Sequence, residues 1–297
     1  SVVVNWQREL ARFAPCLTVF MLNDIAATDR TECIRQLDAN DVLVLTYGLL
    51  VTERDMLVKS DWITVCLDEA HTIKNRDTKA SAAAMQLKAT NRIILTGTPI
   101  QNHLGELWNL MQFINPGLLG SYEHFTQRFI TPIAVGKQEP KQQLKRMIAP
   151  FMLRRTKQQV VRELPDKEEI RVPVQLSDEE MAVYEVIRRE AKEELETSSS
   201  VSVNALSMIT RLREAACSAS LAEKKWKGIS NKLEALKDKL IPIVEGGNKV
   251  LVFSQFTSFL QMAREAIENA GMKDYFYLDG STPIKERQRM VEAFQKG

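Results

Sequence analysis

Two adjacent carboxylates stand at the end of an apolar run in VCLDEAHTIKN, residues 65–75. Asp68 and Glu69 follow the run directly, and His71 lies two residues further on. Magnesium is a hard cation that favours carboxylate oxygens and keeps much of its hydration shell. A neighbouring carboxylate can accept a proton from an attacking water. The spacing therefore predicts that Asp68 holds Mg²⁺ through a water and that Glu69 activates the attacking water. The alternative is that the pair merely begins a solvated loop.

A second polar segment, LTGTPIQN at residues 95–102, follows the next apolar run along the chain. Its Thr-Gly-Thr-Pro turn offers hydroxyls, free backbone N–H groups and a fixed bend. Ligands of parallel α/β sheets bind beside the carboxyl ends of the strands, so this turn is a second candidate for the same site. The alternative is an ordinary strand-to-helix turn that Thr or Asn caps.

The elements that must position these two loops alternate between strands and helices. Apolar spacing predicts helices at 78–89 and 104–114, and residues 1–13 fit either a strand or a helix. This alternation predicts an α/β fold with a mostly parallel sheet that helices cover on both faces. Four runs rich in Val, Ile and Leu, without polar alternation, predict strands buried on both faces: 17–22, 41–47, 63–68 and 92–97.

The strand pattern fades between about residues 118 and 240, where helical spacing dominates. Ser177 and Glu180 form a capping box that opens a helix, and a small polar break at 197–200 separates it from the next helical run. This middle stretch predicts a mainly helical insertion or bridge.

The α/β pattern returns at residue 249. KVLVFSQF and DYFYLDGS predict two strands, and the helix between them ends at Gly271. Thr282 and Pro283 suit the N-cap and first position of a last helix. Two strands do not complete an α/β domain. The predicted division is therefore 1–117, 118–240 and 241–297.

Composition excludes several classes of protein. Hydrophobic residues make up 44% of the 297 residues and charged residues 26%, with a net charge of +2, which is typical of a globular protein. The four cysteines form no C-x-x-C pair and only three histidines are present, so the sequence predicts neither a zinc site nor a disulfide framework. No apolar run reaches the ~18 residues that a membrane span needs. We expect no signal peptide, no membrane contact and a reducing compartment.

Taken together, these segments resemble the Swi/Snf family of ATP-dependent DNA translocases, within helicase superfamily two. LDEAHTIKN resembles the DEAH-box motif, and LTGTPIQNHLGELWNLMQFINP resembles motif three with its following helix. SVVVNWQREL, LTYG, PFMLRRTKQQVVRELPDKEE, KVLVFSQF and YLDGSTPIKERQRMVEAF resemble further segments of the family, so the likeness extends from residue 1 to 297. It implies a RecA-like parallel-sheet lobe, a helical insertion and the start of a second RecA-like lobe.

The resemblance also implies roles for individual residues. Asp68 would hold Mg²⁺, Glu69 would activate water and His71 would link the nucleotide site to motif three. Five residues of motif three would couple hydrolysis to movement: Thr96, Gly97, Thr98, Gln101 and Asn102. Six residues would face the DNA backbone from the second lobe: Ser254, Gln255, Gly280, Ser281, Thr282 and Arg287.

Residues 1–297 contain no phosphate loop of the form G-x-x-x-x-G-K-[ST], whose backbone N–H groups would cradle phosphates. The nearest candidate, Gly136-Lys137, is followed by Gln138 and has Thr131 in place of the first glycine. In the family, that loop lies upstream of the segment matching residue 1, and the arginine-bearing motif six lies downstream of the segment matching residue 297. We therefore expect an internal piece of a longer protein that does not hydrolyse ATP alone.

A basic stretch from 144 to 162 contains no acidic residue. Arg154, Arg155 and Lys157 within it could contact phosphates along a duplex. The alternative, slightly favoured for the two arginines, is that they hold the two lobes together.

Isolated aromatic and histidine residues receive simpler interpretations. Trp6 and Trp108 lie among apolar residues at helical spacing, which favours core packing over base stacking. His103 and His124 belong to no cluster of potential ligands and are expected at the surface or at helix caps.

The implied function is a DNA-dependent ATPase that walks along duplex DNA. The implied cofactors are ATP and Mg²⁺, and the implied partner is double-stranded DNA carrying a bound protein such as RNA polymerase or a nucleosome. Two alternatives remain open: a strand-separating helicase of the same superfamily, and a DNA-binding scaffold without catalysis. The expected location is the cytoplasm, on the nucleoid, for a bacterial protein, or the nucleus for a eukaryotic one.

Overall fold

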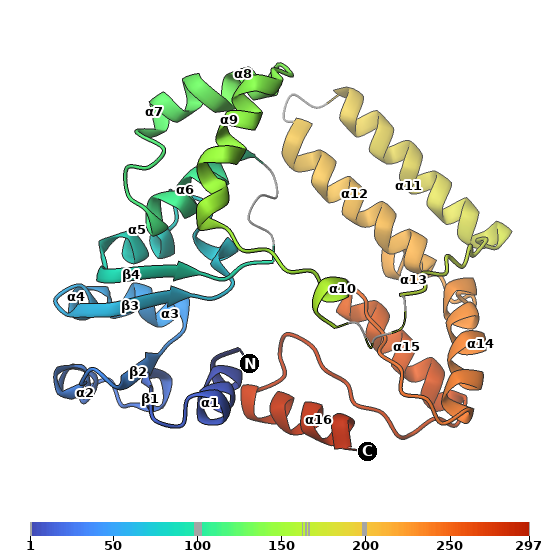
Figure 1. The fold of residues 1–297 in the computed structure, drawn as a ribbon. Helices are drawn as coiled ribbons and strands as arrows, with labels where there is room; N and C mark the ends of the chain where they lie inside the picture. Colours follow the sequence, from blue (N-terminus) through green and yellow to red (C-terminus); the bar gives the residue numbers. More distant parts are fainter. Residues whose placement is uncertain are drawn as a thin grey trace. The chain divides into compact units, whose positions relative to one another are not determined.

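The computed structural model describes residues 2–97, 103–161, 163, 165, 167–197 and 201–296. The chain forms two compact units, Ser1–Leu164 and Pro165–Gly297 (Figure 1). Their boundary falls inside the predicted insertion, so the three-part division at 117 and 240 stays a prediction.

The first unit begins with alternating helices and strands and ends with helices only (Figure 1). Its elements are α1 (Val2–Phe13), β1 (Thr18–Met21), η1 (Leu22–Asp24), α2 (Arg30–Gln36), β2 (Asp41–Val44), α3 (Tyr47–Thr52), α4 (Arg54–Leu57), β3 (Asp61–Leu67), η2 (Ala70–Ile73), α5 (Lys79–Gln86), β4 (Lys88–Ile94), α6 (Leu104–Ile114), α7 (Tyr122–Phe125), the π-helical η3 (Thr126–Ile130), α8 (Thr131–Ala134), α9 (Gln138–Ile148), η4 (Ala149–Phe151) and α10 (Lys157–Val160).

All strand pairing in the described residues is parallel, as predicted. β1 pairs with β2 in a register that runs from Thr18 opposite Asp41 to Met21 opposite Val44. β3 pairs with β4 from Asp61 opposite Lys88 to Leu67 opposite Ile94. The two pairs form separate two-stranded sheets among the described residues, where a single sheet was expected.

The prediction that these strands are buried on both faces is wrong for both sheets. In the first sheet only Met21 of β1 is buried, and no residue of β2 is buried. Ile63 on β3 is 59% exposed and Ile93 on β4 is 47% exposed. A run of Val, Ile and Leu reflects a preference for the extended backbone, whereas burial of both faces requires covering elements that the strand itself does not encode.

The helix predicted at 104–114 is confirmed as α6. The helix predicted at 78–89 forms as α5 but ends at Gln86, because residues 88 and 89 already belong to β4. The hydroxyl of Thr78 caps α5 by accepting a hydrogen bond from the backbone N–H of Ser81 at 3.2 Å. Within the ambiguous residues 1–13, Val2–Phe13 form α1, in agreement with the helical spacing of Trp6, Leu10 and Phe13 rather than with the β-branched start.

Two hydrophobic clusters form the interior of the first unit. One lies beneath the strands and includes Leu50, Leu57, Ile73, Ala84 and Phe113. The other lies between α6 and α9 and includes Leu107, Met111, Phe125, Phe129 and Leu144. Helix α6 contributes to both clusters, so it is buried along most of its length and is fixed from two sides.

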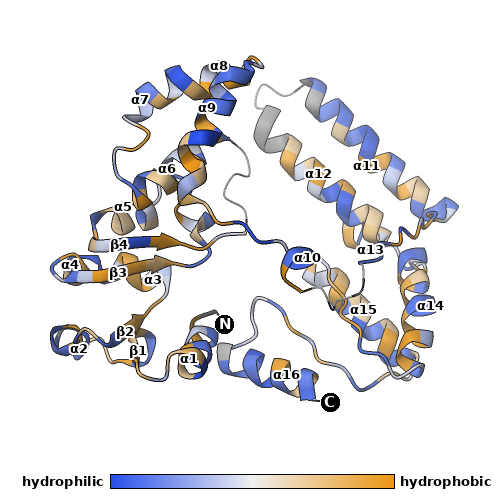
Figure 2. Cartoon of the chain, in the orientation of Figure 1, coloured by the Kyte–Doolittle hydropathy of each residue, from blue (hydrophilic) through white to orange (hydrophobic). Residues whose placement is uncertain are grey.

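The second unit is helical in its described residues (Figure 1). Its elements are α11 (Asp178–Thr197), α12 (Val201–Cys217), α13 (Ala219–Ala222), α14 (Asn231–Glu245), α15 (Thr257–Asn269) and α16 (Ile284–Lys296). Helices α11 and α12 lie side by side, and both carry hydrophobic and hydrophilic residues interleaved along their length, as Figure 2 shows. The helical character predicted for 118–240 is confirmed.

Helix ends in the second unit follow the sequence signals closely. The capping box is confirmed: the Ser177 N–H donates to Glu180 Oε2 and the Glu180 N–H donates to Ser177 Oγ, each at 3.1 Å. Gly271, just beyond α15, adopts φ +87°. Helix α16 begins at Ile284, one residue later than predicted, because the Thr282 hydroxyl accepts the Asp279 N–H and closes the preceding turn.

The strands predicted from KVLVFSQF and DYFYLDGS are not formed in the described residues. A strand requires a neighbouring strand to pair its backbone groups, and neither segment has one here. Phe253 is 86% exposed and Leu251 is 65% exposed, so the apolar character of this segment is not matched by burial. No helix in the described ranges is long and apolar enough to cross a membrane.

Candidate functional site

The two polar loops start side by side at the carboxyl ends of β3 and β4. Leu95 follows β4, and its N–H donates to the carbonyl of Leu67 at 2.8 Å. The carbonyl of Leu95 in turn accepts the N–H of Ala70 at 3.0 Å, across the turn that contains the carboxylates. The parallel register of the two strands therefore brings the segment 68–71 next to the start of the segment 95–102.

The Asp68 carboxylate is held by two donors. Its Oδ2 accepts the indole N–H of Trp6 at 2.9 Å, and its Oδ1 accepts the backbone N–H of Glu69 at 2.8 Å. The hydroxyl of Tyr47 donates to the Asp68 carbonyl at 2.8 Å. Burial, followed by the nearby charge of Asp68, raises the pKa of Tyr47 well above its ordinary value, so the phenol stays protonated and keeps donating. Asp68 is thereby fixed from α1 and α3.

Glu69 has a strained backbone. It is the only non-glycine residue in the described ranges with positive φ, at φ +47° and ψ +48°. This left-handed conformation costs a residue with a β-carbon roughly 1–2 kcal/mol. Strain of this kind gathers at functional sites, where the surrounding structure maintains it. Here the chain turns sharply out of β3 and leaves the Glu69 side chain 57% exposed, within reach of a ligand or a water.

His71 lies beside Glu69 across this turn. Its Nδ1 is 3.2 Å from Glu69 Oε2, and its side chain is 45% exposed. A solvent-exposed pair of this kind contributes at most about 1 kcal/mol to stability. The contact therefore orients the two side chains without removing either from solvent.

The motif-three residues are only partly described. The structure places Thr96 and Gly97 in the segment directly after β4, and a β-carbon added at Gly97 would meet no atom within 4 Å. Thr98, Gln101 and Asn102 lie outside the described residues. The coupling role assigned to these five residues stays a prediction.

The candidate DNA-facing residues of the second unit lie in two segments, and the structure shows how each is held. Ser254 Oγ accepts the N–H of Phe256 at 3.1 Å, and the side-chain oxygen of Gln255 accepts a hydrogen bond from Arg213.

The second segment is a tight turn around Asp279. Its carboxylate accepts the N–H of Ser281 at 2.8 Å and the Ser281 hydroxyl at 2.6 Å, which lowers the pKa of Asp279. Arg287 Nη2 donates to the Asp279 carbonyl at 2.7 Å. Arg287 thus stabilises the turn that carries Gly280 and Thr282.

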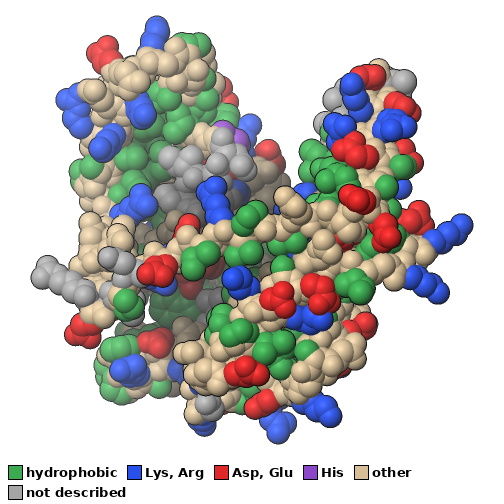
Figure 3. Space-filling view, turned by 90° about the vertical axis from the view of Figure 1, so that its right-hand side faces the viewer, with side chains coloured by type: hydrophobic (Ala, Val, Ile, Leu, Met, Phe, Trp, Pro, Cys, Tyr) green, Lys and Arg blue, Asp and Glu red, His purple; other side chains and the backbone are tan. Residues whose placement is uncertain are grey.

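Arg154, Arg155 and Lys157 are exposed, and their side chains make no hydrogen bond or ion pair with another described residue. Their side chains are therefore available to a partner. Elsewhere charge is mixed, and on the face in Figure 3 basic and acidic side chains are interspersed over the surface.

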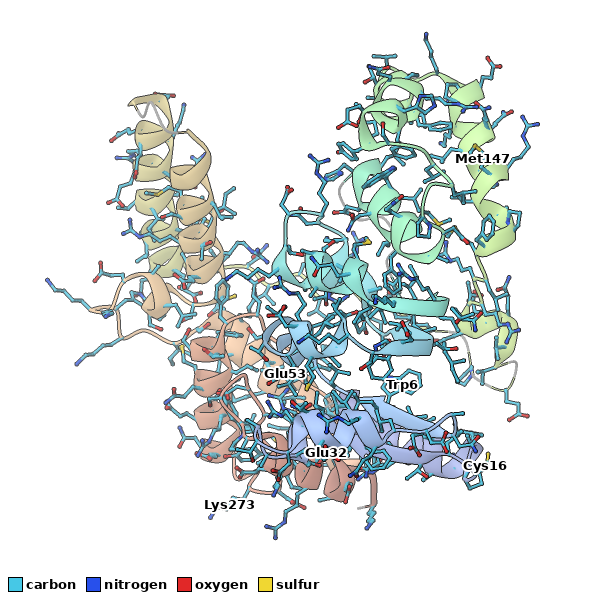
Figure 4. All side chains as sticks on the ribbon, turned by 90° about the vertical axis from the view of Figure 1, so that its left-hand side faces the viewer. Trp6, Cys16, Glu32, Glu53, Met147 and Lys273 are labelled. Carbon is cyan, nitrogen blue, oxygen red and sulfur yellow. The ribbon has the colours of Figure 1, made fainter. Side chains whose placement is uncertain are left out.

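Some contributors to the site carry no local signal in the sequence. Trp6 was expected only to pack in the core, yet its indole N–H reaches a carboxylate 62 positions away; it is labelled in Figure 4. Trp108 follows the core prediction: it packs edge-on against Tyr122, with ring centroids 5.2 Å apart. His103 and His124 are exposed, as expected.

Comparisons with known proteins agree on one family. The model of the SNF2-related domain matches residues 1–221, and the model of the helicase conserved C-terminal domain matches residues 231–297. Among curated relatives, YwqA of Bacillus subtilis, named as an ATP-dependent helicase/translocase, is 34% identical over 306 residues, which cover 100% of this chain and 33% of that protein. The mouse SWI/SNF-related matrix-associated actin-dependent regulator of chromatin subfamily A member 1 is 33% identical over 310 residues, which cover 99% of this chain and 29% of that protein.

A solved structure gives the same result. The SWI2/SNF2 ATPase core of Sulfolobus solfataricus, solved in complex with double-stranded DNA, matches with a TM-score of 0.50 and 32% identity. The match covers 100% of this chain and 63% of that one. The chain thus spans about a third of the length of the curated relatives it matches. The α/β fold class with RecA-like lobes is confirmed, and the chain belongs to the SNF2-related family and continues into a helicase C-terminal domain.

Proposed function

We propose that the protein containing this chain is a DNA-dependent ATPase that translocates on duplex DNA and remodels protein–DNA complexes. The observation that carries the proposal is the turn at residues 68–71. A fixed carboxylate, a strained and exposed carboxylate and a histidine stand together at the carboxyl end of a parallel strand. Ligands of α/β folds bind at such strand ends.

The residues present fit the cofactors ATP and Mg²⁺. In the described ranges no three His, Cys, Asp or Glu side chains gather to enclose a metal, and Asp68 is the carboxylate that we propose for Mg²⁺. Magnesium is commonly bound in this way, through one or two carboxylates, waters and substrate phosphates. Each oxygen of Asp68 accepts one hydrogen bond here and keeps a lone pair for a metal-bound water. When bound, Mg²⁺ would neutralise charge on the phosphates.

Asp68 and Glu69 have different surroundings and therefore different proposed roles. Asp68 is anchored by Trp6 and Tyr47, which suits a residue that must hold a charged ligand in one position. Glu69 touches His71 and solvent, which suits a residue that accepts a proton from the attacking water. Thr96 and Gly97 follow Leu95, which is hydrogen-bonded to this turn, and we propose that they respond to the state of the nucleotide.

Duplex DNA is the proposed partner. The similar SWI2/SNF2 ATPase core was solved with double-stranded DNA, and Arg154, Arg155 and Lys157 are exposed and available to phosphates. The cargo would be a DNA-bound protein. The mouse relative is named as a regulator of chromatin, which points to nucleosomes in eukaryotes, and RNA polymerase is the bacterial counterpart that we propose. Relatives include both bacterial proteins and a yeast nuclear protein, so the proposed location is the nucleoid or the nucleus according to the organism.

The main alternative is a strand-separating helicase, because several relatives carry the word helicase in their names. Two assays with the full-length protein separate the activities. A translocase displaces the third strand of a DNA triplex when ATP is present and leaves a tailed duplex intact. Separation of the tailed duplex at a rate comparable to that of triplex displacement would instead support the strand-separating helicase.

Glu69→Gln in the full-length protein tests catalysis itself. Glutamine keeps the size of the side chain but cannot accept a proton near neutral pH. General-base catalysis contributes about 10²–10⁴-fold, so DNA-stimulated ATP hydrolysis should fall by about that factor while ATP binding stays normal. Single-turnover hydrolysis beside an ATP-binding titration measures both. Turnover within about threefold of wild type, well short of the general-base range, would show that Glu69 does not activate the water. A wild-type protein without DNA-stimulated hydrolysis would support the scaffold.

A further inference from the structure

Helix α6 is joined to the segment that follows the carboxylate-bearing turn by an ion pair that the proposed catalytic roles do not use. Lys74, immediately after η2, places its Nζ 3.3 Å from Glu106 Oε1 in the first turn of α6. The Glu106 side chain is only 4% exposed and that of Lys74 only 22%. Burying a carboxylate costs free energy unless a positive partner and hydrogen bonds compensate for the lost water. Lys74 supplies the positive partner for the Glu106 carboxylate at this position.

One turn further along α6, Asn109 makes a second connection to the same place. Its side-chain N–H₂ group donates to the Ile73 carbonyl at 2.6 Å and to Ser81 Oγ at 2.8 Å. Asn109 is 3% exposed and Ser81 is 1% exposed. Ile73 is the last residue of η2 and Ser81 lies on α5, so a single buried amide binds α6 to two elements.

These contacts lie on the C-terminal side of the motif-three loop. The motif-three loop runs from Leu95 to His103, between β4 and α6. Its start is tied to the 68–71 turn by backbone hydrogen bonds between Leu95, Leu67 and Ala70. Its far end leads into α6, which Lys74 and Asn109 tie to the residues that follow the same turn. The start of the loop is therefore anchored on the 68–71 turn, and the helix after it is anchored on residues 73 and 74, directly beyond that turn.

We propose that Lys74, Glu106 and Asn109 are positioning residues that hold the far end of the 95–103 loop in register with Glu69 and His71. This inference rests on the proposed function, since it assigns the loop to the coupling of ATP hydrolysis with movement. With these contacts in place, a change at the 68–71 turn is transmitted through Lys74 and Asn109 to α6. Without them, α6 no longer follows the turn and hydrolysis no longer drives the DNA.

The test uses the full-length protein carrying Lys74→Met and Glu106→Gln together. This double variant keeps an unbranched side chain of similar size at both positions and removes both charges, which avoids leaving one buried charge alone. Misplacement of groups near a reacting centre by about 1 Å can reduce rates by about 100-fold. We expect DNA-stimulated kcat to fall by about 10–100-fold with the KM for ATP within about twofold. We also expect fewer base pairs travelled per ATP hydrolysed.

Hydrogen–deuterium exchange supplies a readout that is independent of activity. In the double variant, amides of residues 70–74 and 103–107 should exchange faster, while the β1–β2 pair should be unchanged. The single variant Lys74→Arg preserves the charge. It should therefore retain most of the coupling ratio, which is the number of base pairs travelled per ATP hydrolysed.

A matched control exists in the same unit. Arg30 Nη1 lies 2.5 Å from Glu53 Oε1, with side chains 16% and 24% exposed, and the Arg30 Nε–H donates to the Ile25 carbonyl rather than to either loop; Glu53 is labelled in Figure 4. Arg30→Met with Glu53→Gln should lower thermal stability without changing kcat or base pairs per ATP.

The inference fails if the Lys74/Glu106 double variant folds and shows wild-type kcat and a wild-type coupling ratio. It also fails if the two double variants reduce kcat equally, since that result indicates a general loss of stability. If the variant at positions 74 and 106 does not fold, Ser81→Ala replaces it. That change removes one acceptor of Asn109, and an unchanged coupling ratio would again overturn the inference. Failure of the proposed function is a separate result, namely a wild-type protein that does not hydrolyse ATP with DNA.

Discussion

At the scale of single residues, the main finding is that the two adjacent carboxylates differ in their environment rather than in their chemistry. Asp68 receives hydrogen bonds from the Trp6 indole and the Glu69 backbone, whereas Glu69 lies on a strained turn open to solvent. The anchored carboxylate of Asp68 suits the binding of a metal ion in one position, and the exposed carboxylate of Glu69 suits the transfer of a proton from water. Adjacent residues at a strand end can therefore carry separate roles.

Trp6→Phe tests the anchor on Asp68. Phenylalanine keeps an aromatic ring and removes the N–H that donates to Oδ2. Loss of a partner that orients a metal-associated group typically reduces metal affinity or activity by about 10–100-fold. In the full-length protein we therefore expect the Mg²⁺ concentration that half-saturates ATP binding to rise by about 10-fold. Isothermal titration of Mg²⁺ with ATP present measures this shift directly.

Trp62→Phe is the matched control for this experiment. Its indole N–H donates to the carbonyl of Leu57 at 3.0 Å, so its loss affects packing in the same unit without touching Asp68. We expect a reduced unfolding free energy and an unchanged Mg²⁺ requirement for this variant. An equal Mg²⁺ requirement in both variants would show that Trp6 does not position the carboxylate.

At the scale of elements, helix ends are where local chemistry and observed structure agree best. Thr78 caps α5, and the Ser177–Glu180 box caps α11, because a side-chain oxygen satisfies a backbone N–H that has no partner inside the helix. Such contacts span three residues and do not depend on the rest of the fold. Anchors such as Asn109 on α6 connect distant elements and have no comparable local signature.

Ser177→Ala tests the contribution of the capping box to α11. The change removes the oxygen that accepts the Glu180 N–H. Loss of an N-cap typically costs about 1 kcal/mol, so the unfolding free energy from urea titration, followed by far-UV circular dichroism, should fall by about that amount. Ser207→Ala, at an exposed position within α12, is the control and should change stability by only a few tenths of a kcal/mol. Equal stability of the two variants would mean that the box does not hold the end of α11.

At the scale of the whole molecule, the exposed basic residues after α9 are the strongest candidates for long-range electrostatic contact. Replacing Arg154, Arg155 and Lys157 with Ala in the full-length protein should flatten the salt dependence of duplex binding. Each phosphate contact that is lost should lower the log–log slope by about 0.9. Fluorescence anisotropy with a labelled duplex at several salt concentrations measures the slope.

A second basic cluster provides the control for that measurement. Lys224, Lys225 and Lys227 are also exposed, and their replacement removes the same charge from another place. An equal change in slope from both triple variants would reflect net charge alone. An unchanged slope with reduced unfolding stability in the first variant would instead assign Arg154 and Arg155 to holding the lobes together.

The sequence alone determined the class of fold, the parallel direction of the paired strands, the positions of most helices and the two loops that carry the chemistry. These features depend on short-range patterns: apolar periodicity, caps and a polar turn after a strand. The tertiary structure decided what depends on distant residues. It brought the Trp6 indole to Asp68 and the buried Glu106 to Lys74, left both sheets partly exposed, and left residues 249–256 and 274–281 without strand pairing. A strand, a buried ion pair or a fixed carboxylate requires a partner in space, and the chain specifies that partner only through its complete packing.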